Sequence, residues 1–256
     1  MKKLFTILTS ILLTFVIMLG TGCGSISTSI FKGDYTSVSA EKALSIANKC
    51  NIVSVNNTGL KIEFDIDDYG EEQEVEIELS YSTGRPLLKM ETEEVGVDLD
   101  IYYIDGYAYA KGNLDGDITK VKYQTTLKEL IFNEGTQYED EASDSRLFDP
   151  RTVISMYRNY DGVKFYTETT NKYVKIKVTY TLVYEMPNVG KETTVRSYVY
   201  VFDKSYNYVA SMILVTKERV YRGSKETSKK EYLAERYDGK VKIPSSSELA
   251  KYSPLS

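Results

Sequence analysis

The feature that most constrains this chain is an alternation of apolar and polar residues along short segments. Apolar side chains alternate with acidic ones from Ile62 to Asp67, and the same period returns from Val75 to Tyr81. A period of two is typical of a half-buried β-strand, because successive side chains of a strand point to opposite faces. The second half of the chain repeats the pattern in longer segments and predicts strands at 163–169, 172–185, 193–203, 207–222 and 226–237.

Helix signals interrupt the strands at a few places. They are Ser39 as N-cap of a helix at 40–50, capping boxes at Thr126/Glu129 and Ser245/Glu248, and Asp149 before Pro150. The acidic stretch 133–148 predicts a loop. Short turns such as Asp105-Gly106 predict antiparallel neighbours, and no regular βαβ alternation is present. We therefore predict one α+β domain over residues 39–256, with about ten mostly antiparallel strands.

The composition argues against an enzyme. The 256 residues include no histidine, which removes the usual general base and the commonest transition-metal ligand. The acidic pairs Glu76/Glu78 and Asp98/Asp100 lie two residues apart, as on the solvated face of a strand. We therefore expect no catalytic residues, no cofactor and no metal. The net charge of −5 also makes nucleic acid an unfavourable partner.

One acidic segment imitates a calcium-binding loop. Residues Asp65 to Glu76 match that pattern at most positions, but Tyr69 occupies a ligand position and Glu72 stands where an apolar residue is needed. The flanking residues alternate as strands and do not follow a helical period. We therefore expect a charged hairpin turn at this place.

The N-terminus has the marks of an export signal. Lys2 and Lys3 precede an uncharged run of 16 residues from Leu4 to Leu19. The alternative is a permanent membrane span, but the run is shorter than the roughly 20 apolar residues that a spanning helix needs. We expect residues 1–22 to be a signal peptide.

The end of that run, Leu19-Gly20-Thr21-Gly22-Cys23, resembles the lipobox of bacterial lipoproteins, although Gly20 departs from the usual Leu, Val or Ile. The resemblance implies cleavage between Gly22 and Cys23 and a diacylglyceryl group on Cys23. The protein would then be exported and anchored to the outer face of the cell membrane, with residues 23–38 as a flexible tether. Cys50 would be left without a disulfide partner, as a small buried apolar residue.

Several strands carry apolar side chains on both faces. The residues concerned are Tyr102, Ile104, Tyr198, Tyr200, Phe202, Met212 and Leu214. Such a strand is covered on both sides, either by helices or by a bound apolar ligand. The sequence leaves both interpretations open, so these seven residues are candidates for lining a ligand cavity.

The stretches 101–112, 198–212 and 237–252 resemble the lipoprotein-carrier half-barrel superfamily, the LolA/LppX-like proteins. The resemblance implies a curved half-barrel sheet, an N-terminal helix, and two short mid-chain helices over the concave face. It also implies that the protein binds a hydrophobic or lipid ligand without catalysis. The alternatives are a surface protein-interaction module with a filled core and, on its 23 tyrosines, a binder of cell-envelope polysaccharide.

Overall fold

The computed structural model describes residues 26–70, 72–94, 97–114, 117–132, 142–186 and 190–255. The predicted signal peptide, the cleavage site at Gly22 and the lipidation site Cys23 lie outside these residues. No helix within the described ranges is long and apolar enough to cross a bilayer.

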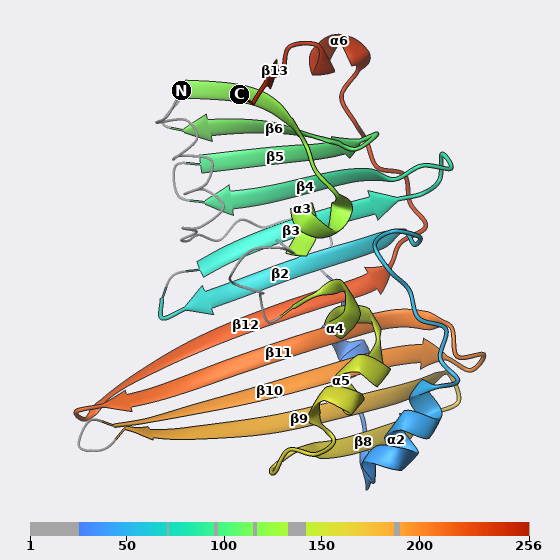
Figure 1. Cartoon of the computed structure of the whole chain (residues 1–256), viewed down its shortest axis with the longest axis vertical. Coiled ribbons are helices and arrows are strands. Elements are labelled where there is room, and N and C mark those ends of the chain that lie inside the picture. Colours follow the sequence, from blue (N-terminus) through green and yellow to red (C-terminus); the bar gives the residue numbers. More distant parts are fainter. Residues whose placement is uncertain are drawn as a thin grey trace.

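Thirteen strands in the described ranges form one open, curved sheet (Figure 1). The first group comprises β2 (Leu60–Asp68), β3 (Glu72–Ser80), β4 (Leu87–Glu94), β5 (Val97–Ile104), β6 (Tyr107–Leu114) and β7 (Asp117–Gln124). The second comprises β8 (Lys164–Thr169), β9 (Tyr173–Met186), β10 (Gly190–Asp203), β11 (Tyr208–Tyr221) and β12 (Ser224–Arg236). The β12–β2 pair joins the groups, and β1 (Thr36–Val38) and β13 (Ser253–Pro254) lie at the edges.

The predicted α+β class with a mostly antiparallel sheet is confirmed. Every pair of named strands is antiparallel except β13 with β7. The sheet has more than the ten strands expected. Two of the additional strands are the edge strands β1 and β13, which are three and two residues long. Such short segments carry too few residues to show a period in the sequence.

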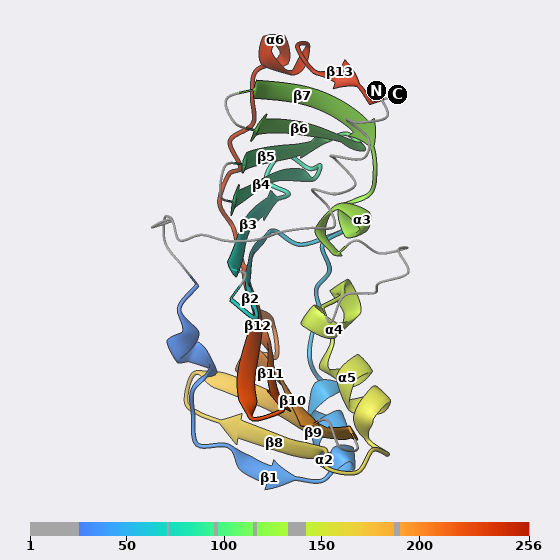
Figure 2. The ribbon, with the colours of Figure 1, turned by 90° about the vertical axis from the view of Figure 1, so that its left-hand side faces the viewer.

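Helices cover one face of the sheet, which we call the helix side (Figures 1 and 2). They are α2 (Ala40–Ala47), α3 (Leu127–Phe132), α4 (Asp144–Phe148) and α5 (Pro150–Tyr157), and α6 (Ser246–Leu249) lies near β13. The predicted caps at Ser39 and Asp149 are present, and Thr126 and Glu129 bond each other's backbone N–H at 2.8 and 3.2 Å. The short helix α4 lies where a loop was expected, and its N-cap Ser143 accepts from Arg146 N.

The segment 26–38 corrects the prediction of a flexible tether. The side chains of Ile26 and Phe31 are 3% and 5% exposed, in a cluster with Val199 and Val201 on the face opposite the helices. Thr28–Phe31 forms the 3-10 helix η1, and β1 pairs with β8. Apolar residues spaced through a polar stretch therefore attach this segment to the sheet.

The calcium-like segment forms a hairpin, as expected. It connects the antiparallel strands β2 and β3, and its turn has positive φ angles of 60° at Tyr69 and 93° at Gly70. Asp67 Oδ1 accepts a hydrogen bond from Gly70 N at 2.8 Å. This carboxylate therefore stabilises the turn.

Candidate functional site

Two rows of apolar side chains cross five strands on the helix side of the sheet. Each row is defined by residues that lie directly opposite one another in the strand register. One row is Ile77, Met90, Ile101, Ala110 and Val121, and the other is Leu79, Leu88, Tyr103, Ala108 and Tyr123. We call these two rows the β3–β7 apolar face. With strands about 4.8 Å apart, each row extends over roughly 19 Å.

The described helices lie mostly away from the β3–β7 apolar face. Helices α2, α4 and α5 lie over β8–β12, and the ring of Phe132 on α3 lies 6.4 Å from that of Phe64 on β2 (Figures 1 and 2). Among the helices that the structure describes, none lies over β5, β6 and β7 on this side. Strand β6 contributes only alanines, the smallest side chains of the two rows, and Ala108 and Ala110 are 0% and 4% exposed.

A polar atom beside these rows has no hydrogen-bond partner in the part of the chain that the structure describes. Thr92 is opposite Val75 on β3 and Leu99 on β5, in the next row along the same face. Its hydroxyl is buried and has no hydrogen bond to any of the described residues. Leaving a buried hydroxyl without a hydrogen bond costs about 1–3 kcal/mol, and a ligand that forms a hydrogen bond with it removes this cost.

Over β9–β11 the helix side is filled by the chain itself. Tyr198, Tyr200 and Phe202 are at most 1% exposed, and the hydroxyls of Tyr157 on α5 and Tyr198 are 3.1 Å apart. Tyr200 donates its hydroxyl proton to Arg146 O on α4. Burial raises the pKa of Tyr198 and of Tyr200, so both phenols stay neutral. These aromatic rings fill the space between helices and sheet.

The seven cavity candidates do not line one surface. Tyr198, Tyr200 and Phe202 belong to the main core on the helix side. Tyr198 lies opposite Ile213, which places Met212 and Leu214 on the other face of the sheet. Tyr102 and Ile104 also lie on that other face, where Ile104 packs with Leu87 and Val241. Alternation within a strand identifies its two faces but not which face of the next strand continues each one.

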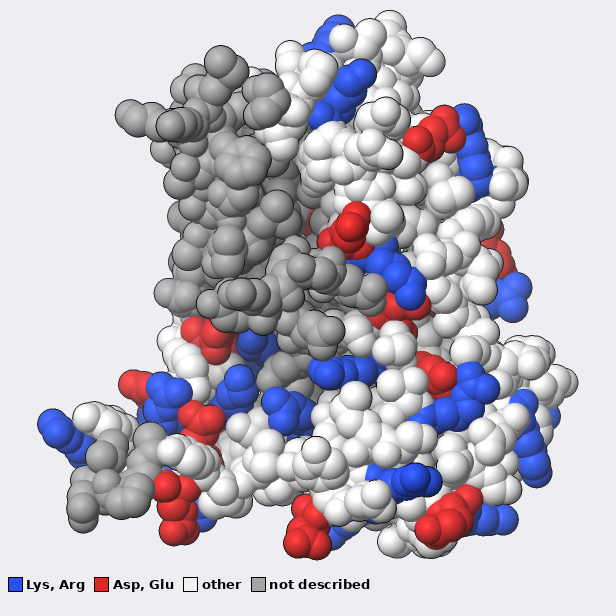
Figure 3. Space-filling model, in the orientation of Figure 1, with Lys and Arg blue, Asp and Glu red and all other residues white. Residues whose placement is uncertain are grey.

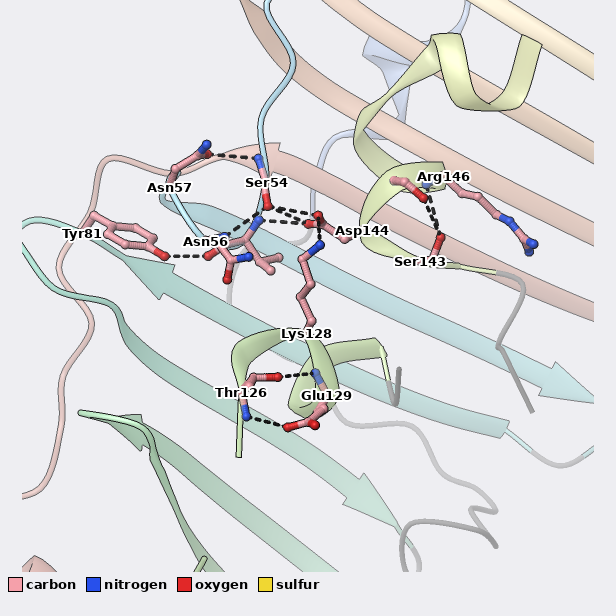
Figure 4. A network of polar contacts seen from close by, with 12 residues as sticks. Ser54, Asn56, Asn57, Tyr81, Thr126, Lys128, Glu129, Ser143, Asp144 and Arg146 are labelled. Atoms are coloured by element: carbon pink, nitrogen blue, oxygen red, sulfur yellow. Dashed lines mark hydrogen bonds and ion pairs between the residues drawn. The ribbon is translucent and has the colours of Figure 1, made fainter. Parts of the chain in front are cut away.

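A buried carboxylate connects the helical layer to the loop before β2 (Figure 4). Asp144 on α4 is 7% exposed and accepts from Val55 N at 3.0 Å and from Ser54 Oγ at 3.0 and 3.2 Å. Lys128 Nζ on α3 lies 3.0 Å from Asp144 Oδ2. Asp144 therefore joins α3, α4 and the loop. The alternation and the capping signals in the sequence did not point to it.

The opposite face of the sheet carries charged side chains that pair with one another. Lys61 and Glu63 are 2.8 Å apart, and Lys111 and Asp100 are 3.2 Å apart. Burial, and then the neighbouring carboxylates of Glu63, Glu91 and Glu78, raise the pKa of Glu76, while Lys61 opposes the shift. On the helix side, charged side chains of both signs are mixed over the lower half of the molecule (Figure 3).

The first described residue is fixed to the sheet at Glu63. Both carboxylate oxygens of Glu63 accept from Ile26 N, at 2.9 and 3.0 Å, in a buried position. Cys23 is three residues before Ile26 in the sequence.

Cys50 is buried at 6% exposure in the main core, as expected. Burial raises the pKa of its thiol to about 12, which suits an inert core residue.

No protein-family model matches the sequence, and no curated protein is significantly similar to it.

Proposed function

We propose that this protein is an exported lipoprotein, anchored through Cys23, that holds a hydrophobic or lipid ligand on the β3–β7 apolar face without catalysis. The observation that carries the proposal is the pair of apolar rows across five strands, over most of which no described helix lies. A sheet face of this kind needs an apolar cover to be stable in water.

The chemistry of the face favours an amphiphilic ligand. The rows offer aliphatic and aromatic contacts but no charged side chain, which suits a long acyl chain. The hydroxyl of Thr92, which has no partner among the described residues, lies beside them and is a suitable partner for a carbonyl, ester or hydroxyl group. A ligand that is apolar along most of its length and polar at one end therefore fits both observations.

The N-terminal sequence, with its apolar run and the lipobox-like Leu19–Cys23, supports the anchor. Two acyl chains on Cys23 give stable membrane attachment, whereas a single chain gives only marginal binding. Replacing Cys23 by Ser should leave the protein without diacylglyceryl. Mass spectrometry of the N-terminal peptide should find the lipid on wild-type Cys23, and an unmodified wild-type Cys23 would contradict the anchor.

Ligand binding is tested by filling the β3–β7 apolar face. Ala110→Phe places a ring among the smallest side chains of the rows, and we expect at least tenfold weaker binding of a fluorescent fatty-acid probe to the mature chain. Ile118→Phe is the matched control, because Ile118 lies on the other face of β7 and is 63% exposed. Equal binding by the two folded variants, or no binding by the unsubstituted chain, would contradict the proposal.

A second candidate is a protein-interaction module. It is favoured by the exposed apolar side chains near the end of β9, where Leu182, Val183 and Tyr184 are 42%, 51% and 66% exposed. Exposed apolar residues that lie together often mark a contact surface.

A further inference from the structure

Strand β9 has one edge that is only partly covered. Strand β8 pairs with it from Val174 to Thr179, but β9 continues to Met186. The turn before β8 still reaches the edge at Thr181, where a Cβ on Gly162 would lie 3.6 Å from Thr181 O. From Leu182 to Glu185, no strand among the described residues lies beside β9 on the side away from β10. Figure 1 shows this part of β9 to β12 projecting beyond the helices.

This edge lacks the usual protection against strand pairing. Natural sheets protect their edges with very short strands, prolines or lysines. The outer strand β1 is only three residues long, and Pro254 in β13 has no N–H to donate. The segment Leu182-Val183-Tyr184-Glu185 has high β-propensity and contains no lysine, glycine or proline. Its side chains are exposed, so nothing described on either face covers it.

An open edge selects an extended strand as its partner, because its free N–H and C=O groups repeat along the strand. A second copy of the same edge is complementary in one antiparallel register. With Val183 opposite Val183 of the second copy, Leu182 lies opposite Tyr184, and Glu185 lies opposite Thr181. Apolar side chains then meet apolar ones, and no like charges lie opposite each other. Moving the register by one residue places Glu185 opposite Leu182.

This register also fits attachment to a membrane. When Val183 lies opposite Val183 of the second copy, both side chains point to the same side of the joined sheet. The helix sides of the two copies then lie on one side, and the opposite faces lie on the other. The docked Ile26 segments of the two copies would then both lie on the face opposite the helices, as two copies in one membrane require. This last argument rests on the proposed anchor, whereas the edge and its self-complementarity do not.

We propose that two copies of the chain pair antiparallel through Leu182–Glu185 of β9, about a two-fold axis at Val183. The contact is small, so we expect weak association that becomes significant at high protein concentration or when both copies share a membrane.

The first test changes the charge at the axis. The full lipoprotein in detergent micelles is examined by sedimentation up to about 100 µM, a range suited to a weak interface. Val183→Lys places two lysines opposite each other and should weaken dimerisation at least tenfold. Mixing it with Val183→Glu should restore a dimer. Val220→Lys, at a 37% exposed position within the same projecting part of the sheet, should dimerise like the wild type.

The second test examines the register by disulfide cross-linking in native membranes. Val183→Cys should cross-link to itself under mild oxidation, because the two positions face each other. Leu182→Cys should not cross-link alone but should do so when co-expressed with Tyr184→Cys. The wild type serves as the background control for Cys23 and Cys50.

A monomeric wild type over the whole concentration range, or a dimer that Val183→Lys leaves unchanged, would overturn the proposal. So would equal cross-linking of Leu182→Cys and Val183→Cys. None of these outcomes depends on ligand binding, and mass spectrometry of the N-terminal peptide tests the anchor by itself, so the proposal and the proposed function fail separately.

Discussion

Glu63 provides a buried polar contact between the N-terminal segment and the sheet. It accepts from Ile26 N and from Lys61 Nζ, and its side chain is 10% exposed. A buried carboxylate with two kinds of donor contributes more than an exposed ion pair, and replacing it by an amide removes the negative charge beside Lys61 and one of the two oxygens that accept from Ile26 N. Glu63 therefore adds a buried polar contact to the apolar contacts that hold Ile26 against the sheet.

We predict that Glu63→Gln lowers the free energy of unfolding by about 2–3 kcal/mol, measured by urea denaturation of the mature chain. Glu91→Gln is the matched control. Glu91 also pairs with a lysine two residues before it, Lys89 at 2.6 Å, but its side chain is 47% exposed. Its loss should cost less than about 1 kcal/mol. Similar losses in the two variants would show that Glu63 has no special role.

Cys50 gives a prediction that depends on pH. Burial raises the pKa of its thiol from the ordinary value of 9.0 to about 12, so folding favours the neutral thiol. The neutral, buried thiol therefore contributes fully to the free energy of unfolding below about pH 9, and this contribution is lost as the pH rises towards 12. We expect a thiol reagent to leave Cys50 unmodified in the folded mature chain at pH 8 and to modify it after denaturation in urea. Rapid modification without urea would contradict the burial of the thiol.

At the scale of the elements, Asp144 holds the short helices α3 and α4 in place. Helices of five or six residues are unstable alone, so their position depends on tertiary contacts. Asp144→Ala should lower the free energy of unfolding by about 3 kcal/mol, because it removes the acceptor of Ser54, Val55 and Lys128.

The control for Asp144 is Asp149, the N-cap of α5, which accepts from Arg151 N at 2.9 Å. Asp149→Ala should cost about 1 kcal/mol, as expected for a lost cap. In hydrogen exchange, Asp144→Ala should also expose the Val55 amide, and Asp149→Ala should not. Unchanged protection of Val55 in Asp144→Ala would contradict the role of Asp144.

The strands were more predictable than the short elements. The second strand group lies within about three residues of the expected ranges, because long alternating segments define a strand by themselves. The capping signals at Ser39, Thr126 and Asp149 also held. Helix α4 and the docking of residues 26–38 were missed, because contacts far apart in sequence stabilise both of them.

At the scale of the whole molecule, the two strand groups differ in which of the described helices lie over them. Over β8–β12, helices and aromatic rings fill the space on the helix side, whereas β3–β7 carry two continuous apolar rows. The sequence indicated apolar residues on both faces of several strands, but not how the faces join across the sheet. That depends on register, including the irregularity between Val201 and Phe202 that places Phe202 opposite Tyr208.

The central claim is that the β3–β7 apolar face holds a lipid, and native mass spectrometry of the full lipoprotein purified from membranes tests it most directly. Our account predicts a non-covalently bound lipid, in addition to the acyl chains on Cys23, on the wild type and on Ile118→Phe. The same lipid should be lost from Ala110→Phe. Equal amounts of bound lipid on all three proteins, or none on the wild type, would contradict the account.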